Sequence, residues 1–343
     1  MASTLSVRRV AGRPVSSGRR DLLVALASVW LAGGLFLDGW AHAHVPELET
    51  FFTPWHGVLY SGYAALAISH VPSRLWRGRP EGPIQGWVPT GYGLGLLGAV
   101  LFAAGGVIDM TWHTLFGIEV DLEALLSPPH LLLLTSGSLM IATPIRAAAA
   151  KLAGSSLAPV LISACSGTAV TAFFLSYLSP FTDAPAADIG RGGYGGESFG
   201  LGEFLVYSGV MVTAVLFTWS RLGRVPPGLI TVVVAAASIP NGVFDDFSNA
   251  SAQLWPLLGA VLADAAVQWT AATRPRWVPL AAGVLLPALV WPAHLLGVEL
   301  SLGVHWSLEL WSGIVVLCSL AGAALGGLFL PHGRREESVV PPV

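Results

Sequence analysis

Ten apolar stretches, each close to the length that crosses a lipid bilayer, run through nearly the whole chain and constrain its fold more than any other feature. A spanning helix needs about 20 mainly apolar residues. The composition agrees, since 54% of the 343 residues are hydrophobic and 11% are charged, whereas a soluble domain carries about 25% charged residues. The predicted spans are residues 21–41, 55–72, 88–111, 129–149, 157–178, 203–220, 227–241, 253–272, 277–296 and 306–330. We therefore predict an all-α, polytopic integral membrane protein of about ten transmembrane helices.

The connections between these stretches are mostly short, so we expect no separate soluble domain. A basic tail (1–20), a single transmembrane domain (21–330) and a C-terminal tail (331–343) account for the chain. The longest connection, 179–202, is rich in glycine and is typical of a surface loop.

The basic residues predict the orientation in the membrane. If the N-terminus is cytoplasmic, every lysine and arginine except Arg191 falls in a cytoplasmic segment, as the positive-inside rule requires. We therefore expect both termini in the cytoplasm and the chain in the cell inner (plasma) membrane as a multi-pass protein. Most of the nine histidines then gather on the extracytoplasmic side. These are His42, His44, His56, His113, His130, His294 and His305.

One pattern of acidic residue and histidines occurs twice, in the predicted hairpins 38–62 and 109–137. In each, an aspartate precedes a histidine by four residues, so the two side chains share one face of a helix. A second histidine follows a proline that suits the start of the next helix. The carboxylate can bind a metal itself or orient an imidazole that does. The candidate metal ligands are Asp38, His42, His56, Asp109, His113 and His130.

A third group lies near the C-terminus, where His294 ends one predicted helix and His305 and Glu309 begin the next. Its order is reversed, with the histidine before the carboxylate. We therefore treat this group as analogous to the repeat and not as a clear third copy of it. We add His294 and His305 to the candidate metal ligands. A structural alternative exists for all these histidines, because amphipathic side chains gather with Trp and Tyr at membrane interfaces.

Three carboxylates are candidate catalytic residues. Glu119 lies in a predicted outer loop, and Glu309 begins the last predicted helix. Asp264 falls near the middle of an apolar stretch, where an ionisable group is a functional candidate by default. A hydrogen bond to a neighbouring helix would explain Asp264 equally well.

Several chemistries lack their motifs. The chain contains no P-loop, G-x-S-x-G, H-E-x-x-H or C-x-x-C-H sequence, so nucleotide use, classical serine hydrolysis and c-type haem have no support. The two cysteines lie in apolar runs and read as buried small residues. The basic residues form short topology signals, which argues against nucleic-acid binding.

The two Asp-x3-His…His units, Asp38-x3-His42…His56 and Asp109-x3-His113…His130, resemble a known metal site. They are similar to the Asp-x3-His…His ligand set in the C subunit of the particulate methane and ammonia monooxygenases. The resemblance covers these two segments alone. It implies copper as the metal and oxidation of a small substrate by oxygen as the reaction class.

Three functions follow as hypotheses. The first is a copper- or iron-dependent membrane oxidoreductase, since His and carboxylate ligands suit copper(II), iron and zinc. The second is a metal-handling, transport or respiratory-assembly protein. The third is a zinc-dependent membrane lipid hydrolase, with a free carboxylate as base. The expected partners are the lipid bilayer, a small apolar or lipid substrate and other subunits of a homo- or hetero-oligomer.

Overall fold

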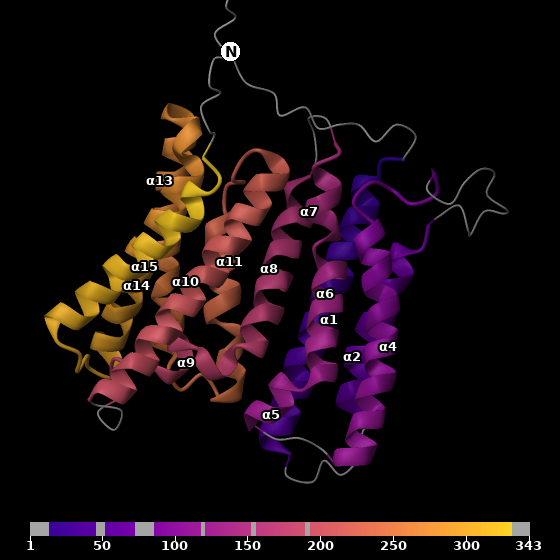
Figure 1. The fold of residues 1–343 in the computed structure, drawn as a ribbon, viewed down its shortest axis with the longest axis horizontal. Coiled ribbons are helices and arrows are strands. Elements are labelled where there is room, and N and C mark those ends of the chain that lie inside the picture. The colour runs from indigo at the N-terminus through magenta and orange to yellow at the C-terminus, as the bar shows by residue number, and fades with distance from the viewer. Residues whose placement is uncertain are drawn as a thin grey trace, which may run out of the picture.

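A computed structural model describes residues 14–45, 52–72, 86–117, 121–151, 156–188 and 193–330, and its regular elements in these ranges are all helices. Eight helical segments of this part are long and apolar enough to cross a membrane. Figure 1 shows the helices side by side, with the N-terminal helices at one edge, the C-terminal helices at the other and α8 between them.

The N-terminal half contains the two hairpins that the sequence pattern singles out. Its helices are α1 (Gly18–His44), α2 (Pro54–His70), α4 (Gly93–Phe116), α5 (Asp121–Leu126), α6 (Pro128–Ile141), α7 (Thr143–Ala148) and α8 (Leu157–Phe174). They pack around one buried apolar cluster that includes Leu31, Leu59, Phe102 and Met140. This core holds the first hairpin, α1–α2, against the second, α4–α6.

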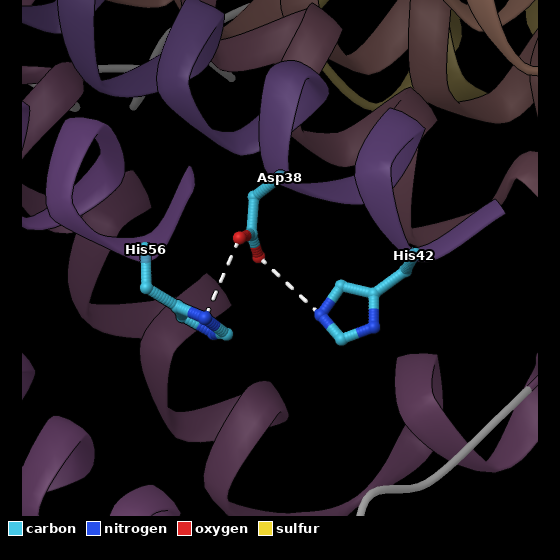
Figure 2. A group of neighbouring side chains, drawn as sticks. All are labelled: Asp38, His42 and His56. Carbon is cyan, nitrogen blue, oxygen red and sulfur yellow. Dashed lines mark ion pairs between the residues drawn. The ribbon is translucent and has the colours of Figure 1, made fainter. Parts of the chain in front are cut away.

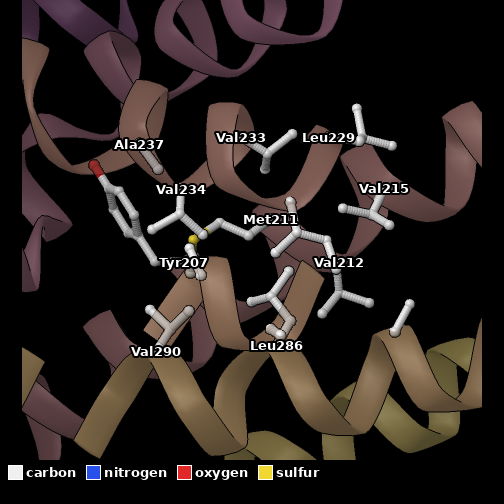
Figure 3. Close-up of a cluster of buried hydrophobic side chains, with 14 of the residues drawn as sticks. Tyr207, Met211, Val212, Val215, Leu229, Val233, Val234, Ala237, Leu286 and Val290 are labelled. Carbon is white, nitrogen blue, oxygen red and sulfur yellow. The ribbon is translucent and has the colours of Figure 1, made fainter. Parts of the chain in front are cut away.

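A second buried apolar cluster fills the C-terminal half and takes in residues of α7 and α8, and Figure 3 draws part of it. Side chains of Met211, Val233 and Leu286 come together there from three different helices. The longer elements of this half are α10 (Tyr194–Leu222), α11 (Leu229–Ser238), α13 (Pro256–Thr273), α14 (Val278–Ser301) and α15 (Leu308–Gly327). The shorter ones are η2 (Ser176–Leu178), α9 (Pro180–Asp183), η4 (Pro240–Phe244), α12 (Ala250–Leu254) and η5 (Pro275–Trp277).

Two of the ten predicted spans are not among these eight segments. The stretch 55–72 forms α2, which has 17 residues and is about 26 Å long. The stretch 227–241 forms α11, which has 10 residues and continues into η4. The structure thus has fewer full-length spanning helices among its described residues than the ten that the apolar pattern predicts.

Polar contacts define one end of the N-terminal half, which we call the basic end. Arg20 at the start of α1 donates hydrogen bonds to the carbonyls of His70 and Val71 at the end of α2, at 2.9 and 2.8 Å. Arg146 of α7 donates to the Gly91 carbonyl before α4, at 3.2 Å, and Lys151 pairs with Asp21. The end of α1, the start of α2, the end of α4 and the start of α6 therefore lie together at the opposite end.

Candidate metal centre

The first hairpin brings three of the predicted ligands together at the end opposite the basic end. Asp38 and His42 lie one turn apart near the end of α1, and His56 lies in the first turn of α2. Figure 2 shows the Asp38 carboxylate between the two imidazoles. Its Oδ2 lies 3.8 Å from His42 Nε2 and its Oδ1 lies 3.5 Å from His56 Nδ1. We call this group the first triad.

The second hairpin holds an equivalent group, the second triad. Asp109 and His113 lie one turn apart near the end of α4, and His130 lies in the first turn of α6. Asp109 Oδ1 is 3.4 Å from His113 Nε2 and 3.2 Å from His130 Nε2. The histidine rings of the two triads are also similarly spaced, with centroids 5.8 Å apart for His42 and His56 and 5.6 Å apart for His113 and His130.

These separations resemble those between ligands of one metal ion. Two atoms bound tetrahedrally at about 2.0–2.1 Å from a metal lie roughly 3.3–3.4 Å from each other. In each triad one ligand atom per residue can be chosen so that all three lie within 4.8 Å of one another. Oδ1 of Asp38 and Oδ1 of Asp109 are buried, and neither accepts a hydrogen bond from the described residues. A cation bound in each triad would give both oxygens a partner.

Neighbouring groups fix the orientation of the imidazoles. The Gly117 carbonyl, which can only accept, lies 3.2 Å from His113 Nδ1, so Nδ1 is the donor of this hydrogen bond and Nε2 is the ring nitrogen that faces Asp109. The N-cap hydroxyl of each second helix contacts the histidine three residues later. Thr53 Oγ1 lies 3.0 Å from His56 Nδ1, and Ser127 Oγ lies 2.9 Å from His130 Nδ1. At His130 the contact uses the nitrogen opposite to Nε2, which faces Asp109, and such an arrangement is typical of histidines that bind metals. At His56 the same Nδ1 contacts Thr53 and faces Asp38.

Both triads line the same cavity, which has a volume of about 510 Å³. Asp38 interacts electrostatically with Asp109 and His113, across the two hairpins. No lysine or arginine of the described residues lines this cavity. Two buried carboxylates that repel each other without a lysine or arginine among the described lining residues are costly, and metal cations would relieve that repulsion.

Away from the triads the cavity wall is apolar. The cavity is lined by α1, α2, α4, α5, α6 and α8 of the N-terminal half and by η2 and η4. Its apolar wall includes Leu31, Leu35, Phe102, Phe173, Phe174 and Phe244. The cavity therefore combines a cluster of potential metal ligands with space for an apolar molecule.

The structure does not gather the third predicted group into a metal site. Within the described ranges, only the two triads bring three or more His, Cys, Asp or Glu side chains close enough to hold a metal ion. His294 is buried among the rings of Phe181, Phe204 and Trp291, and its Nδ1 lies 2.9 Å from the Ala252 carbonyl. His305 is exposed in the connection between α14 and α15.

The three candidate catalytic carboxylates also lie apart from the triads or outside the described residues. Glu119 falls in the undescribed range 118–120. Glu309 is exposed in the first turn of α15. Asp264 of α13 accepts hydrogen bonds from the backbone N–H and the hydroxyl of Thr231, at 3.1 and 3.0 Å. These bonds favour the structural explanation of Asp264.

Sequence reasoning missed three features of this site. The N-cap hydroxyls carry a signal, because Thr53-Pro-x-His56 and Ser127-Pro-x-His130 share one pattern. Tyr60, which lies one turn after His56, also lines the cavity, and no repeat marks it. The apolar wall from α8 and η4 depends on helix neighbours that the sequence order does not reveal. No family model, no curated protein and no solved structure matches the chain.

Proposed function

We propose that each triad binds a transition-metal ion and that the chain is an integral membrane metalloprotein, with copper- or iron-dependent oxidation of a small substrate as its reaction class. The observation that carries this proposal is the pair of Asp-His-His triads on one cavity that lacks lysine and arginine among its described lining residues. Either triad alone could be an interfacial or packing feature. Two triads with the same residue types at the same helix positions, and with carboxylate-to-imidazole distances of 3.2 to 3.8 Å, favour a metal site.

The donor set supports the choice of metal. Imidazole nitrogen with carboxylate oxygen suits copper(II), iron and zinc, and thiolate would be needed for softer sites. Neither cysteine lines the cavity. Three protein ligands for each ion leave room for a small exogenous ligand. A redox metal beside an apolar chamber would supply oxidation chemistry to an apolar molecule held there, and the resemblance to the monooxygenase ligand set points the same way.

The basic end supports an orientation. By the positive-inside rule, Arg20, Arg146 and Lys151 face the cytoplasm, and the triads then open toward the extracytoplasmic side of the inner membrane. His70 at the basic end is buried, with its ring nitrogens 2.8 Å from the Leu66 carbonyl and 2.9 Å from the Thr143 hydroxyl. Among the described residues, the basic end thus offers no second metal site for transfer across the membrane, so retention of the metal is favoured over transport.

Elemental analysis of the protein purified in mild detergent tests this proposal, with the His42→Ala/His113→Ala double variant beside the wild type. Copper or iron that is present in the wild type and lost in the variant supports the oxidoreductase. Zinc that is present in the wild type and lost in the variant favours the lipid hydrolase over the oxidoreductase. If neither protein binds metal, even after incubation with copper(II) or iron(II), the proposal is overturned.

A further inference from the structure

Tyr60 occupies a special place in the candidate metal centre. It lies on α2 one turn after His56, and its ring stacks beside the His56 ring, with centroids 6.3 Å apart and planes inclined by 23°. The ring also meets Phe102 of α4 edge-on, at 6.4 Å. Tyr60 lines the cavity that both triads share. Its side chain therefore reaches from the first hairpin toward the second.

Helix α4 provides space for the phenol. A Cβ on Gly106 would lie 3.0 Å from the Tyr60 hydroxyl oxygen, so the hydroxyl rests directly against the Gly106 backbone. Gly106 precedes Asp109 by three residues, which is about one helical turn. Asp109 and Asp38 both lie near enough to the Tyr60 side chain to repel a negative charge on its oxygen. The hydroxyl is thus placed close to one triad through its own helix and close to the other through α4.

The second hairpin has no counterpart. The residue four positions after His130 is Leu134, which lines the same cavity with an alkyl side chain. Tyr60 is the only tyrosine among the described residues that line it. A residue that merely filled the space beside the ligand helix could be leucine in both hairpins. The hydroxyl of Tyr60 is therefore what distinguishes the first hairpin from the second at this position.

We infer that the Tyr60 hydroxyl donates a hydrogen bond to a small oxygen- or nitrogen-donor ligand held by the metals in this cavity, such as water, hydroxide or azide. This inference rests on the proposed metal binding. A phenol is a good donor, and a bond to a charged acceptor in a site of low dielectric is stronger than one in water. Tyr60 would then help to select what binds at the open metal positions.

Azide binding to the copper(II)-loaded protein tests the inference, with absorption spectra as the readout and metal content measured in parallel. Tyr60→Phe removes only the hydroxyl, and we expect it to weaken azide binding by about tenfold with unchanged copper content. Tyr63→Phe is the matched control. Tyr63 lies on the same helix, but its hydroxyl donates to the Ala99 carbonyl at 2.8 Å and it does not line the cavity.

A second variant tests the placement without removing the phenol. Gly106→Ala would push the hydroxyl away from its position, so azide binding should weaken again. Gly209→Ala, where a Cβ meets nothing within 4 Å, should leave it unchanged. Equal azide affinity in the wild type and Tyr60→Phe, both fully loaded with copper, overturns this inference and leaves the proposed metal binding intact. A wild-type protein that binds no copper overturns both.

Discussion

The N-cap hydroxyl of Ser127 is placed to orient the imidazole of His130 for metal binding. Ser127 makes no capping hydrogen bond to the backbone, and its Oγ contacts His130 Nδ1 instead. We predict that Ser127→Ala lowers metal affinity of the second triad about tenfold, which is the lower end of the effect typical of groups that orient metal-binding histidines. Isothermal titration with copper(II) measures this effect.

The control for Ser127 lies on the same helix. Thr135 donates its hydroxyl to the Leu131 carbonyl and is exposed, so Thr135→Val should leave metal affinity unchanged. If Ser127→Ala and Thr135→Val have the same affinity, the hydroxyl does not orient the imidazole.

For Asp264 we predict an effect on stability and none on metal binding. Because its Oδ2 accepts two hydrogen bonds from Thr231, we expect Asp264→Ala to lower the free energy of unfolding by about 1–3 kcal/mol and to leave metal content unchanged. Asp264→Asn keeps an acceptor oxygen and should lie closer to the wild type. Thermal unfolding in detergent, followed by elemental analysis, separates the two roles. Loss of metal at full stability would assign Asp264 to the functional site.

At the residue scale, the sequence predicts those contacts that depend on local spacing. Asp38 with His42 and Asp109 with His113 follow from four-residue spacing on one helix, and the short hairpins add His56 and His130. His294 could not be placed in this way. Its surroundings come from α9, α10 and α12, which are distant in sequence. The pattern His294…His305…Glu309 contains no information about these helices.

At the element scale, the first triad depends on the close approach of α1 and α2. A Cβ on Gly34 would lie 2.8 Å from Leu59 Cα, and a Cβ on Gly62 would lie 2.8 Å from the Leu31 backbone nitrogen. Small residues at such crossings let helix backbones pack closely in membranes. The glycines therefore set the distance between the helix that carries Asp38 and the helix that carries His56.

We predict that Gly34→Val separates these helices and removes metal from the first triad while the second triad keeps its own. The measurement is metal content per chain, which should fall to about half. Gly283→Val is the matched control, because Gly283 packs against Gly322 where α14 crosses α15. It should destabilise the fold and keep both metals. A fall in metal content that is equal in both variants would show only general unfolding.

The helices themselves were largely predictable, because long apolar runs in a membrane form helices to satisfy their backbone hydrogen bonds. The exceptions have local causes. The stretch 129–149 is split into α6 and α7 near Pro144, since proline lacks the N–H group that continues a helix. The stretch 227–241 ends its α-helix at Ser238, before Pro240 opens η4.

At the scale of the whole molecule, the triads and the basic end lie at opposite ends of the N-terminal bundle, which predicts the sidedness of the protein. A cysteine at Glu309, in the first turn of α15, should react with a membrane-impermeant maleimide in intact cells. A cysteine at Ala272, near the C-terminal end of α13, should react only after the membrane is broken. Both positions are exposed. The reverse pattern would place the triads in the cytoplasm and contradict the orientation.

The measurement that tests the central claim most directly is the copper(II) stoichiometry of the metal-free protein, determined by titration for the wild type and for one histidine variant of each triad. We predict two ions per chain in the wild type, one in His42→Ala, one in His113→Ala and none in the double variant. His70→Ala, whose histidine lies at the basic end, should still bind two. Equal stoichiometry in all five proteins would contradict the assignment of the two triads as the metal centre.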